Sequence, residues 1–210
     1  MNLRILQVIV RVVQRRASLL LPILRSAFQG ELLAWLYLHP DDEFTLTELA
    51  ARFDMSHATV SREADRLVEA SLVTDRRMGN LRLIRANLDT VVARPLTDLL
   101  VVTYGPIVVL SDLLAGVSGV EEAFVYGSWA ARYRGQPGPV PKDVDVLVVG
   151  AADEDELDEV ARTAERILGR EVNVRVVPSK LWRKPAGDPF IATVRSRPLV
   201  AIAHEDRGAP

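Results

Sequence analysis

The sequence predicts a two-domain protein: a mainly α-helical domain that ends in a β-hairpin, then an α/β (α+β) domain with a mixed sheet and flanking helices. Apolar residues recur at helical spacing through most of residues 19–115, whereas strand-like and helical segments alternate from about residue 119. With 210 residues and 49% hydrophobic content, the chain can bury two cores. The expected segments are 1–18, 19–87, 88–117 and 118–210.

The composition excludes several kinds of functional site. The chain has no cysteine, so disulfides, thiolate zinc sites and cysteine nucleophiles are excluded, and a reducing cytoplasm is the expected compartment. The histidines, His39, His57 and His204, show no spacing typical of a histidine metal motif. The net charge of −2 gives no overall attraction to nucleic acid, so any basic surface must be local.

Residues 1–18 are expected to form an amphipathic basic helix. Arg4, Arg11, Arg15 and Arg16 interrupt its apolar residues, so the segment is too short and too charged to span a bilayer or to act as a signal peptide. We expect it to pack within the protein or at a dimer interface, with no membrane partner. A helix on a membrane surface is the alternative.

Two further helical regions are expected. Residues 19–40 carry apolar residues at helical spacing, with Gly30 as a possible break and Pro40 as the end. Residues 88–115 are helical again, with a break near Gly105. This second region either links the two domains or forms a dimer interface.

Between these regions the sequence predicts two short helices joined by a tight turn. Thr45 or Thr47 caps the first helix, and Ser56 caps the second. Two strand-like runs follow, joined by Gly79-Asn80, which favours a hairpin turn. Two helices across a turn with a basic hairpin behind them make a winged helix.

The second short helix and the hairpin carry the residues that we expect to contact DNA. A recognition helix presents its N-terminal residues to the major groove, and a wing contacts phosphates or the minor groove. Residues 76–85 contain four arginines and no acidic residue. The expected contacts are Ser56, His57, Thr59, Ser61 and Arg62 of the helix, and Arg76, Arg77 and Arg82 of the hairpin.

The helical stretch "TLTELAARFDMSHATVSREADRLVEASLV" with the hairpin "RRMGNLRLIRAN" resembles winged helix-turn-helix regulators of the ArsR/MarR kind. The resemblance implies a transcription regulator that binds double-stranded DNA. It also implies a homodimer, because one half-site rarely gives enough specificity. A winged helix that docks onto another protein is the alternative.

In the C-terminal half, "FVYGSWAARYRGQPGPVPKDVDVLVVG" places a Gly-Ser pair before a short helix and two aspartates on the next strand. Alternate residues of a strand point to one face, so Asp143 and Asp145 repel each other unless a cation joins them. Gly127 allows phosphates to approach the backbone, and Ser128 supplies a hydroxyl where the helix starts. A solvent-facing edge strand is the alternative for the two aspartates.

That stretch resembles the minimal nucleotidyltransferases of the DNA polymerase β superfamily, and the resemblance covers roughly residues 118–203. It implies a site for a nucleoside triphosphate (NTP) and Mg²⁺. The residues it implies are Gly127, Ser128, Arg132 and Lys142 for the nucleotide, and Asp143 and Asp145 for the metal.

The same family places a third carboxylate on a later strand, which here is "REVNVRVV". Asn173 lies at the expected position, and an amide cannot accept the proton of an attacking hydroxyl. Glu171, two residues earlier on the same face, is the alternative base.

Three functions are therefore open at this point. The first is a DNA-binding regulator with an NTP- and Mg²⁺-binding domain whose catalysis is impaired. The second is an active transferase of nucleoside monophosphates to a protein or small-molecule hydroxyl, which in some relatives is the antitoxin of a HEPN-type toxin. The third is an inactive transferase fold that serves as a scaffold.

Overall fold

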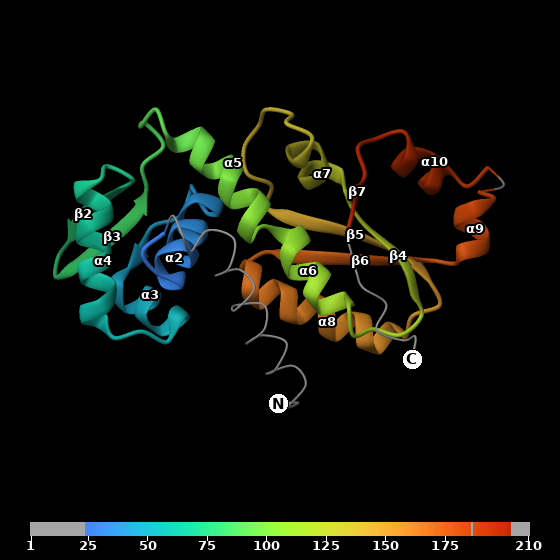
Figure 1. Cartoon of the computed structure of the whole chain (residues 1–210), viewed down its shortest axis with the longest axis horizontal. Coiled ribbons are helices and arrows are strands. Elements are labelled where there is room, and N and C mark those ends of the chain that lie inside the picture. The colour runs from blue at the N-terminus through green and yellow to red at the C-terminus, as the bar shows by residue number, and fades with distance from the viewer. Residues whose placement is uncertain (1–23, 186, 203–210) are drawn as a thin grey trace. The chain divides into compact units, whose positions relative to one another are not determined.

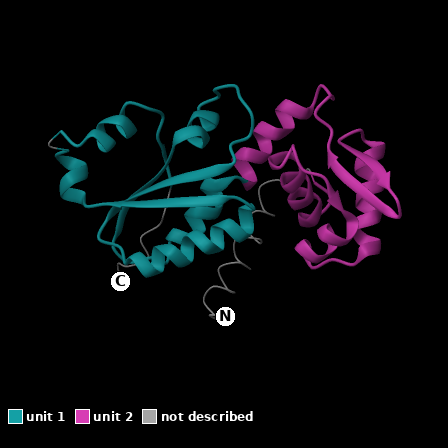
Figure 2. Cartoon of the chain, turned by 180° about the vertical axis from the view of Figure 1, so that it is seen from behind, with its two compact units in different colours: residues 1–12, 105–210 teal, residues 13–104 magenta. Residues whose placement is uncertain are grey.

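The computed structural model describes residues 24–185 and 187–202, so the helix expected at residues 1–18 lies outside the described residues. The chain divides into two compact units, residues 13–104 and residues 105–210 with 1–12 (Figure 2). Each unit has its own core of buried apolar side chains.

The first unit is mainly helical and contains a small antiparallel sheet (Figure 1). The sheet order is β1-β3-β2, and strands β2 and β3 form the hairpin predicted around Gly79-Asn80. The two-residue strand β1 was not predicted, because so short a segment has no periodicity. The elements are α2 (Ala27–Leu38), β1 (Phe44–Thr45), α3 (Leu46–Phe53), α4 (His57–Glu69), β2 (Val73–Met78), β3 (Leu81–Ala86) and α5 (Ala93–Tyr104).

Side-chain caps set the two short helices. Thr45 is the cap of α3, and its side chain and backbone exchange hydrogen bonds with Glu48 in a complete capping box. Ser56 caps α4, and its hydroxyl accepts a hydrogen bond from the Thr59 N–H at 3.1 Å. Between the helices, Asp54 adopts the left-handed conformation. These caps confirm the predicted pair of helices and select Thr45 over Thr47.

Helix α2 forms the centre of this core. It runs through Gly30 without the break that the sequence suggested, because a close helix contact explains the glycine: a Cβ there would lie 2.0 Å from the Tyr104 hydroxyl of α5. Tyr37 is fully buried, and its hydroxyl donates to the Leu72 carbonyl at 2.7 Å. These contacts join α2 to α5 and to the segment between α4 and β2.

The second unit is an α/β structure on a four-stranded mixed sheet, as the sequence predicted. Its strand order is β6-β5-β4-β7, with β5 and β6 parallel and the other pairs antiparallel. The elements are α6 (Pro106–Leu114), β4 (Val120–Tyr126), α7 (Gly127–Tyr133), β5 (Asp143–Gly150), α8 (Glu154–Leu168), β6 (Glu171–Val177), α9 (Ser179–Arg183), α10 (Pro189–Arg195) and β7 (Val200–Ala201).

Helices cover both faces of this sheet. Helices α6 and α8 pack together, and they contact β4 and β6 respectively (Figure 1). On the other face, Leu147 and Val149 of β5 pack with Trp182 of α9 and with Ile191 and Val194 of α10. Strand β5 is therefore an interior strand that is buried on both faces over its second half.

Residues 93–114 contain the break that the sequence predicted. Gly105 separates α5 from α6. Within the described residues, Ala93–Leu114 is the one stretch long and apolar enough to cross a membrane, and 56% of its apolar window is buried inside the structure. Burial of this kind is also found in helices that pack in a protein core.

Candidate functional site

Helix α4 presents its N-terminal end and one face to solvent. Val60, Ala64 and Leu67 are buried against the core, so the opposite face of the helix is exposed. His57 and Arg62 are exposed, and Ser61 is half-buried. The exposed residues have the types that hydrogen-bond with base edges and phosphates.

Two of the predicted contact residues are partly used within the helix. The Ser56 hydroxyl accepts from the Thr59 N–H and lies 2.9 Å from the Thr59 hydroxyl. These groups therefore stabilise the start of α4. His57, Ser61 and Arg62 are left as the side chains of this face that are not committed to the cap.

The hairpin of β2 and β3 has less uncompensated charge than its sequence suggests. Residues 76–85 have no acidic residue, but the fold brings in carboxylates from outside them. Arg76 forms a salt bridge with Glu43, which precedes β1. Arg82 forms two, with Asp65 of α4 at 2.5 Å and with Asp75 of β2 at 2.6 Å.

The hydrogen bonds account for the pKa values of these groups. The bond from Arg76 lowers the pKa of Glu43. Partial burial alone would lower the pKa of Arg82, but its hydrogen bonds to Asp65 and Asp75 outweigh that effect and raise it. Both arginines thus hold their positive charge next to a negative one.

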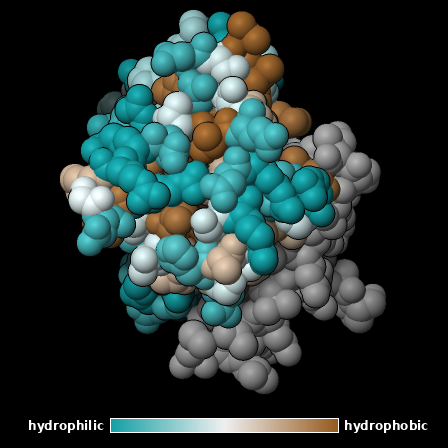
Figure 3. Space-filling model, turned by 90° about the vertical axis from the view of Figure 1, so that its left-hand side faces the viewer, coloured by the Kyte–Doolittle hydropathy of each residue, from teal (hydrophilic) through white to brown (hydrophobic). Residues whose placement is uncertain are grey.

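Arg77 differs from its neighbours on the hairpin. It lies directly opposite Arg82 in the β2–β3 pairing, and it is exposed. Within residues 24–185 and 187–202, no carboxylate forms a salt bridge with it. The surface around the hairpin end of this unit is mainly hydrophilic with separate apolar patches (Figure 3).

The C-terminal unit brings the two predicted metal-binding aspartates to one face of its sheet. Asp143 and Asp145 lie at the start of β5 and are half-buried. Leu147 and Val149 continue the same face into the core beneath α9 and α10. Because β5 lies between β4 and β6, the two aspartates are not on an edge strand.

The environment of Asp145 disfavours its ionised form. Burial and the neighbouring Asp143 charge raise the pKa of Asp145, and a hydrogen bond from Asn173 lowers it in part. Asn173 is also the residue paired with Asp145 in the parallel β5–β6 ladder. Asn173 is the residue for which the resemblance to nucleotidyltransferases implies a carboxylate.

Gly127 is required by the position of Asp145. It has a φ of +70°, and a Cβ there would lie 2.5 Å from Asp145 Oδ2. Helix α7 begins at Gly127 rather than at Ser128, and no side chain caps it. Ser128 is exposed, so its hydroxyl is accessible beside the aspartates' strand.

The other predicted site residues lie around this face without joining the two aspartates. Glu171 pairs with Asp143 in the ladder but is exposed, and no hydrogen bond in the described chain joins it to either aspartate. Arg132 donates to the Gln136 carbonyl at 3.0 Å, and Lys142 is exposed. Among the described residues, no group of three His, Cys, Asp or Glu side chains could hold a metal ion.

The donor set therefore fits one divalent cation better than two. Two carboxylates at alternate positions on one strand face can share a single cation, which would relieve their repulsion. A second cation would need a further carboxylate, and Asn173 offers a neutral amide beside Asp145 instead.

Comparisons with known proteins assign part of the chain. Residues 24–78 match the model of the MarR family. The match runs from the start of the described residues through α2, α3, α4 and β2, so this segment is a MarR-type winged helix-turn-helix.

A solved structure described as reduced HlyU from Vibrio cholerae N16961 is also similar to the chain. The identity is 21%, the likeness covers 42% of this chain and 88% of that chain, and the TM-score is 0.34. At this TM-score the likeness adds nothing to the fold assignment. No curated protein matched the chain.

The structure adds residues to both regions that sequence patterns did not indicate. In the MarR-type region these are Glu43 and Asp65, which pair with hairpin arginines far away in sequence. In the C-terminal unit, burial raises the pKa of Tyr126, and the nearby charges of Asp145 and Arg175 act on it in opposite directions. An aromatic residue directly before Gly127 was the available signal for Tyr126.

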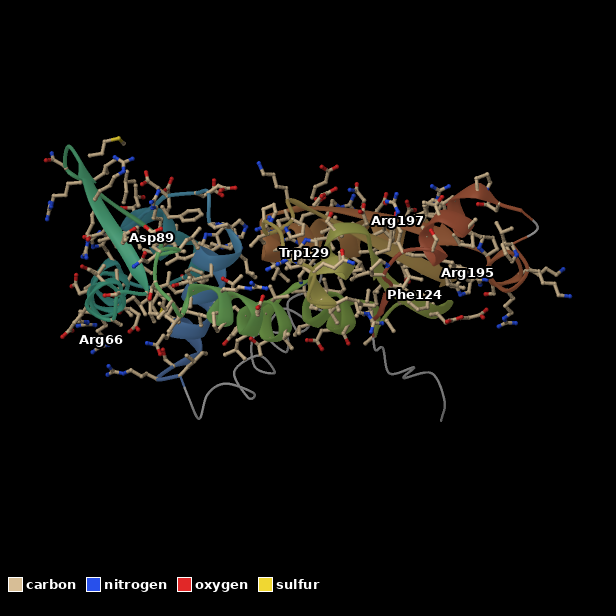
Figure 4. All side chains as sticks on the ribbon, turned by 90° about the horizontal axis from the view of Figure 1, so that it is seen from above. Arg66, Asp89, Phe124, Trp129, Arg195 and Arg197 are labelled. Carbon is tan, nitrogen blue, oxygen red and sulfur yellow. The ribbon has the colours of Figure 1, made fainter. Side chains whose placement is uncertain are left out.

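The remaining aromatic contacts of the C-terminal unit are structural. Trp182 packs on Phe124 with ring centroids 5.5 Å apart, and Arg195 lies over the Trp182 ring at 4.3 Å. Phe124 and Arg195 are labelled at the same end of this unit in Figure 4. Trp182 thus belongs to the core beneath α9 and α10.

Proposed function

We propose that the chain is a DNA-binding transcriptional regulator in which α4 enters the major groove and the β2–β3 hairpin contacts the backbone. The match of residues 24–78 to the MarR family is the observation that carries the proposal. The exposed N-terminal face of α4 supports it, because this is the part of a recognition helix that reaches base edges.

The proposed DNA-contact residues are fewer than those that the sequence suggested. On α4 they are His57, Ser61 and Arg62, which are not committed to the helix cap. On the hairpin the contact is Arg77, which has no salt bridge in the described chain. A second copy of the chain binds the other half-site of the operator, because one recognition helix reads too few base pairs for specificity.

A gel-shift series with a duplex from upstream of the chain's own gene tests this proposal. We expect Arg62→Ala to weaken binding by about 10-fold, since a lost base or phosphate contact costs about 1–3 kcal/mol. Arg162→Ala is the matched control, because it removes an exposed helical arginine from the C-terminal unit. Equal binding by both variants would contradict the role of α4.

We further propose that the C-terminal unit binds an NTP with one Mg²⁺ ion. Asp143 and Asp145 would hold the ion, which would supply charge neutralisation for the phosphates. The nucleotide contacts would come from Gly127, Ser128, Arg132 and Lys142. The chemistry of the donor set supports this, since the two carboxylates repel each other and Gly127 lets the Asp145 carboxylate lie against the start of α7.

In this proposal the unit binds nucleotide and does not transfer it. Asn173 lies beside Asp145, and an amide cannot accept the proton of an attacking hydroxyl. Calorimetry with Mg²⁺ and ATP tests the binding. We expect measurable heat with the wild type and none with Asp143→Asn/Asp145→Asn. Heat that is the same for both proteins would show that the nucleotide binds elsewhere.

The alternative is an active nucleotidyltransferase, including an antitoxin that modifies a HEPN-type partner. The intact Gly-Ser and Asp-x-Asp motifs favour it, whereas Asn173 and the exposed Glu171 oppose it. Transfer of labelled nucleotide to the product of a neighbouring gene, lost in Asp143→Asn/Asp145→Asn, would establish this alternative.

A further inference from the structure

The hairpin of the DNA-binding unit carries four arginines but is surrounded by three carboxylates. Arg76 is paired with Glu43, and Arg82 is paired with Asp65 and Asp75. The Arg76 hydrogen bond is the main cause of the lowered pKa of Glu43, and the charge of Arg85 lowers it as well. In the described chain, Arg77 differs from the other three because it neither forms a salt bridge nor acts on the pKa of Glu43.

The Glu43–Arg76 pair has the geometry of a strong ion pair. The Arg76 Nε lies 2.8 Å from one Glu43 carboxylate oxygen and 3.1 Å from the other, and Nη2 donates to the second oxygen as well. A guanidinium that faces both carboxylate oxygens has most of its donors on that side occupied. The pair joins residues 33 positions apart, so the fold itself brings it together.

The pairs at Arg76 and Arg82 differ in their surroundings. The Arg82 side chain is only 19% exposed and lies between α4 and β2, which identifies it as a structural connection. The Arg76 side chain is 54% exposed, at the surface of the hairpin. If Glu43 did not hold it, the Arg76 guanidinium could reach a phosphate without any change in the core.

We propose that Glu43 holds Arg76 away from DNA phosphates and so lowers the sequence-independent affinity of the winged-helix unit for DNA. This inference rests on the proposed DNA binding by α4 and the hairpin. Phosphate contacts contribute affinity for every sequence, and each one adds about 0.9 to the slope of log affinity against log salt. One phosphate contact fewer therefore weakens binding to every duplex and flattens its salt dependence.

Glu43→Gln in the full-length chain tests the proposal. Affinities are measured by fluorescence anisotropy for the duplex upstream of its own gene and for a shuffled duplex, between about 50 and 200 mM salt. We expect Glu43→Gln to bind the shuffled duplex several-fold more tightly at the low-salt end. We also expect its salt slope to steepen by about 0.9, because Arg76 gains a phosphate contact.

Two variants separate this effect from a general change in charge. Asp41→Asn removes a negative charge two residues before Glu43. Asp41 is exposed and has no salt bridge in the described chain, so we expect this variant to leave the salt slope unchanged. Arg76→Ala should also leave the wild-type slope unchanged. The double variant Glu43→Gln/Arg76→Ala should return to the wild-type slope.

An unchanged slope in Glu43→Gln, or an equal change in Asp41→Asn, would overturn the inference. A flatter slope in Arg76→Ala would overturn it too, because Arg76 would then already contact DNA in the wild type. If the wild type binds no duplex at all, the proposed function fails and this inference fails with it. If the wild type binds DNA and Glu43→Gln has the same affinity and salt slope, only the inference about Glu43 fails and the proposed function stands.

Discussion

At the scale of single residues, several polar groups in this chain are held where water cannot stabilise them fully. Asp145 is half-buried next to Asp143, and both factors raise its pKa. Tyr37 is fully buried, which raises its pKa to about 12. The ionised Asp145 carboxylate destabilises the folded state at neutral pH, whereas the hydrogen-bonded Tyr37 hydroxyl stabilises it. The two residues therefore predict opposite effects on substitution.

Asp145→Asn should raise the melting temperature of the chain at pH 7 in the absence of Mg²⁺. The folded-state pKa of Asp145 lies above its unfolded value, so the ionised carboxylate disfavours folding, and this penalty disappears as the pH falls through the folded pKa. The difference from wild type should therefore shrink between pH 7 and pH 4. Thermal denaturation at both pH values measures it, with the exposed Glu171→Gln as control. A lower melting temperature for Asp145→Asn at pH 7 would contradict this description of the site.

Tyr37→Phe should destabilise the winged-helix unit by about 1 kcal/mol. The loss of stability is small because the Leu72 carbonyl still accepts a second hydrogen bond, from the Asn87 N–H at 3.0 Å, and so is not left without a donor. Because the folded pKa of Tyr37 is about 12 and the unfolded value is 10.0, the stabilisation is present below pH 10 and is lost as the pH rises towards 12. Urea denaturation at pH 7 and pH 11 should give a smaller difference between the two proteins at pH 11. A difference that grows with pH would show that the hydroxyl is not held as described.

At the scale of secondary-structure elements, local caps decide where helices α3 and α4 begin. Thr45 and Ser56 each accept a hydrogen bond from a backbone N–H two or three residues into the helix. The first turn of α4 has no acidic residue, so the Ser56 hydroxyl is the main local contribution to its start. The Ser56 side chain is therefore the main local feature that sets where α4 begins.

Ser56→Ala should lower the stability of the winged-helix unit by about 1 kcal/mol, the usual effect of losing a helix N-cap. It should also weaken DNA binding more than its stability change explains, because His57 and Arg62 follow directly in the capped turns. Urea denaturation and the gel shift measure the two effects, and Thr47→Ala, which removes an exposed hydroxyl from α3, serves as control. Ser56→Asp should restore stability, since aspartate is an equally good cap. Failure of that restoration would contradict the capping role of the Ser56 hydroxyl.

At the scale of the whole molecule, local features of the fold were predictable and long-range pairings were not. The caps at Thr45 and Ser56, the Gly79-Asn80 turn and the break at Gly105 depend on residues close together in sequence. Asn173 was singled out by the resemblance to nucleotidyltransferases, whereas its pairing with Asp145 in the β5–β6 ladder is known from the structure alone. The Glu43–Arg76 and Asp65–Arg82 pairs could not be predicted, because sequence periodicity does not indicate which strands lie side by side.

The two units also differ in how far their function is supported. The winged-helix unit combines a family match over residues 24–78 with an exposed N-terminal end of α4. For the C-terminal unit, the proposed nucleotide site is supported only by the chain's own residues. Its neutral Asn173 amide beside Asp145 argues against catalysis. The account as a whole therefore depends first on specific DNA binding, and nucleotide binding by the second unit would add regulation to it.

The most direct test of this central claim is the affinity of the full-length chain for the duplex upstream of its own gene, compared with a shuffled duplex of the same composition. We predict that the upstream duplex binds at least about 1,000-fold more tightly at physiological salt, which is the lower end for specific DNA-binding proteins. Affinity for both duplexes should fall as salt rises. Equal affinity for the two duplexes, or no binding to either at low salt, would contradict the assignment of the chain as a DNA-binding regulator.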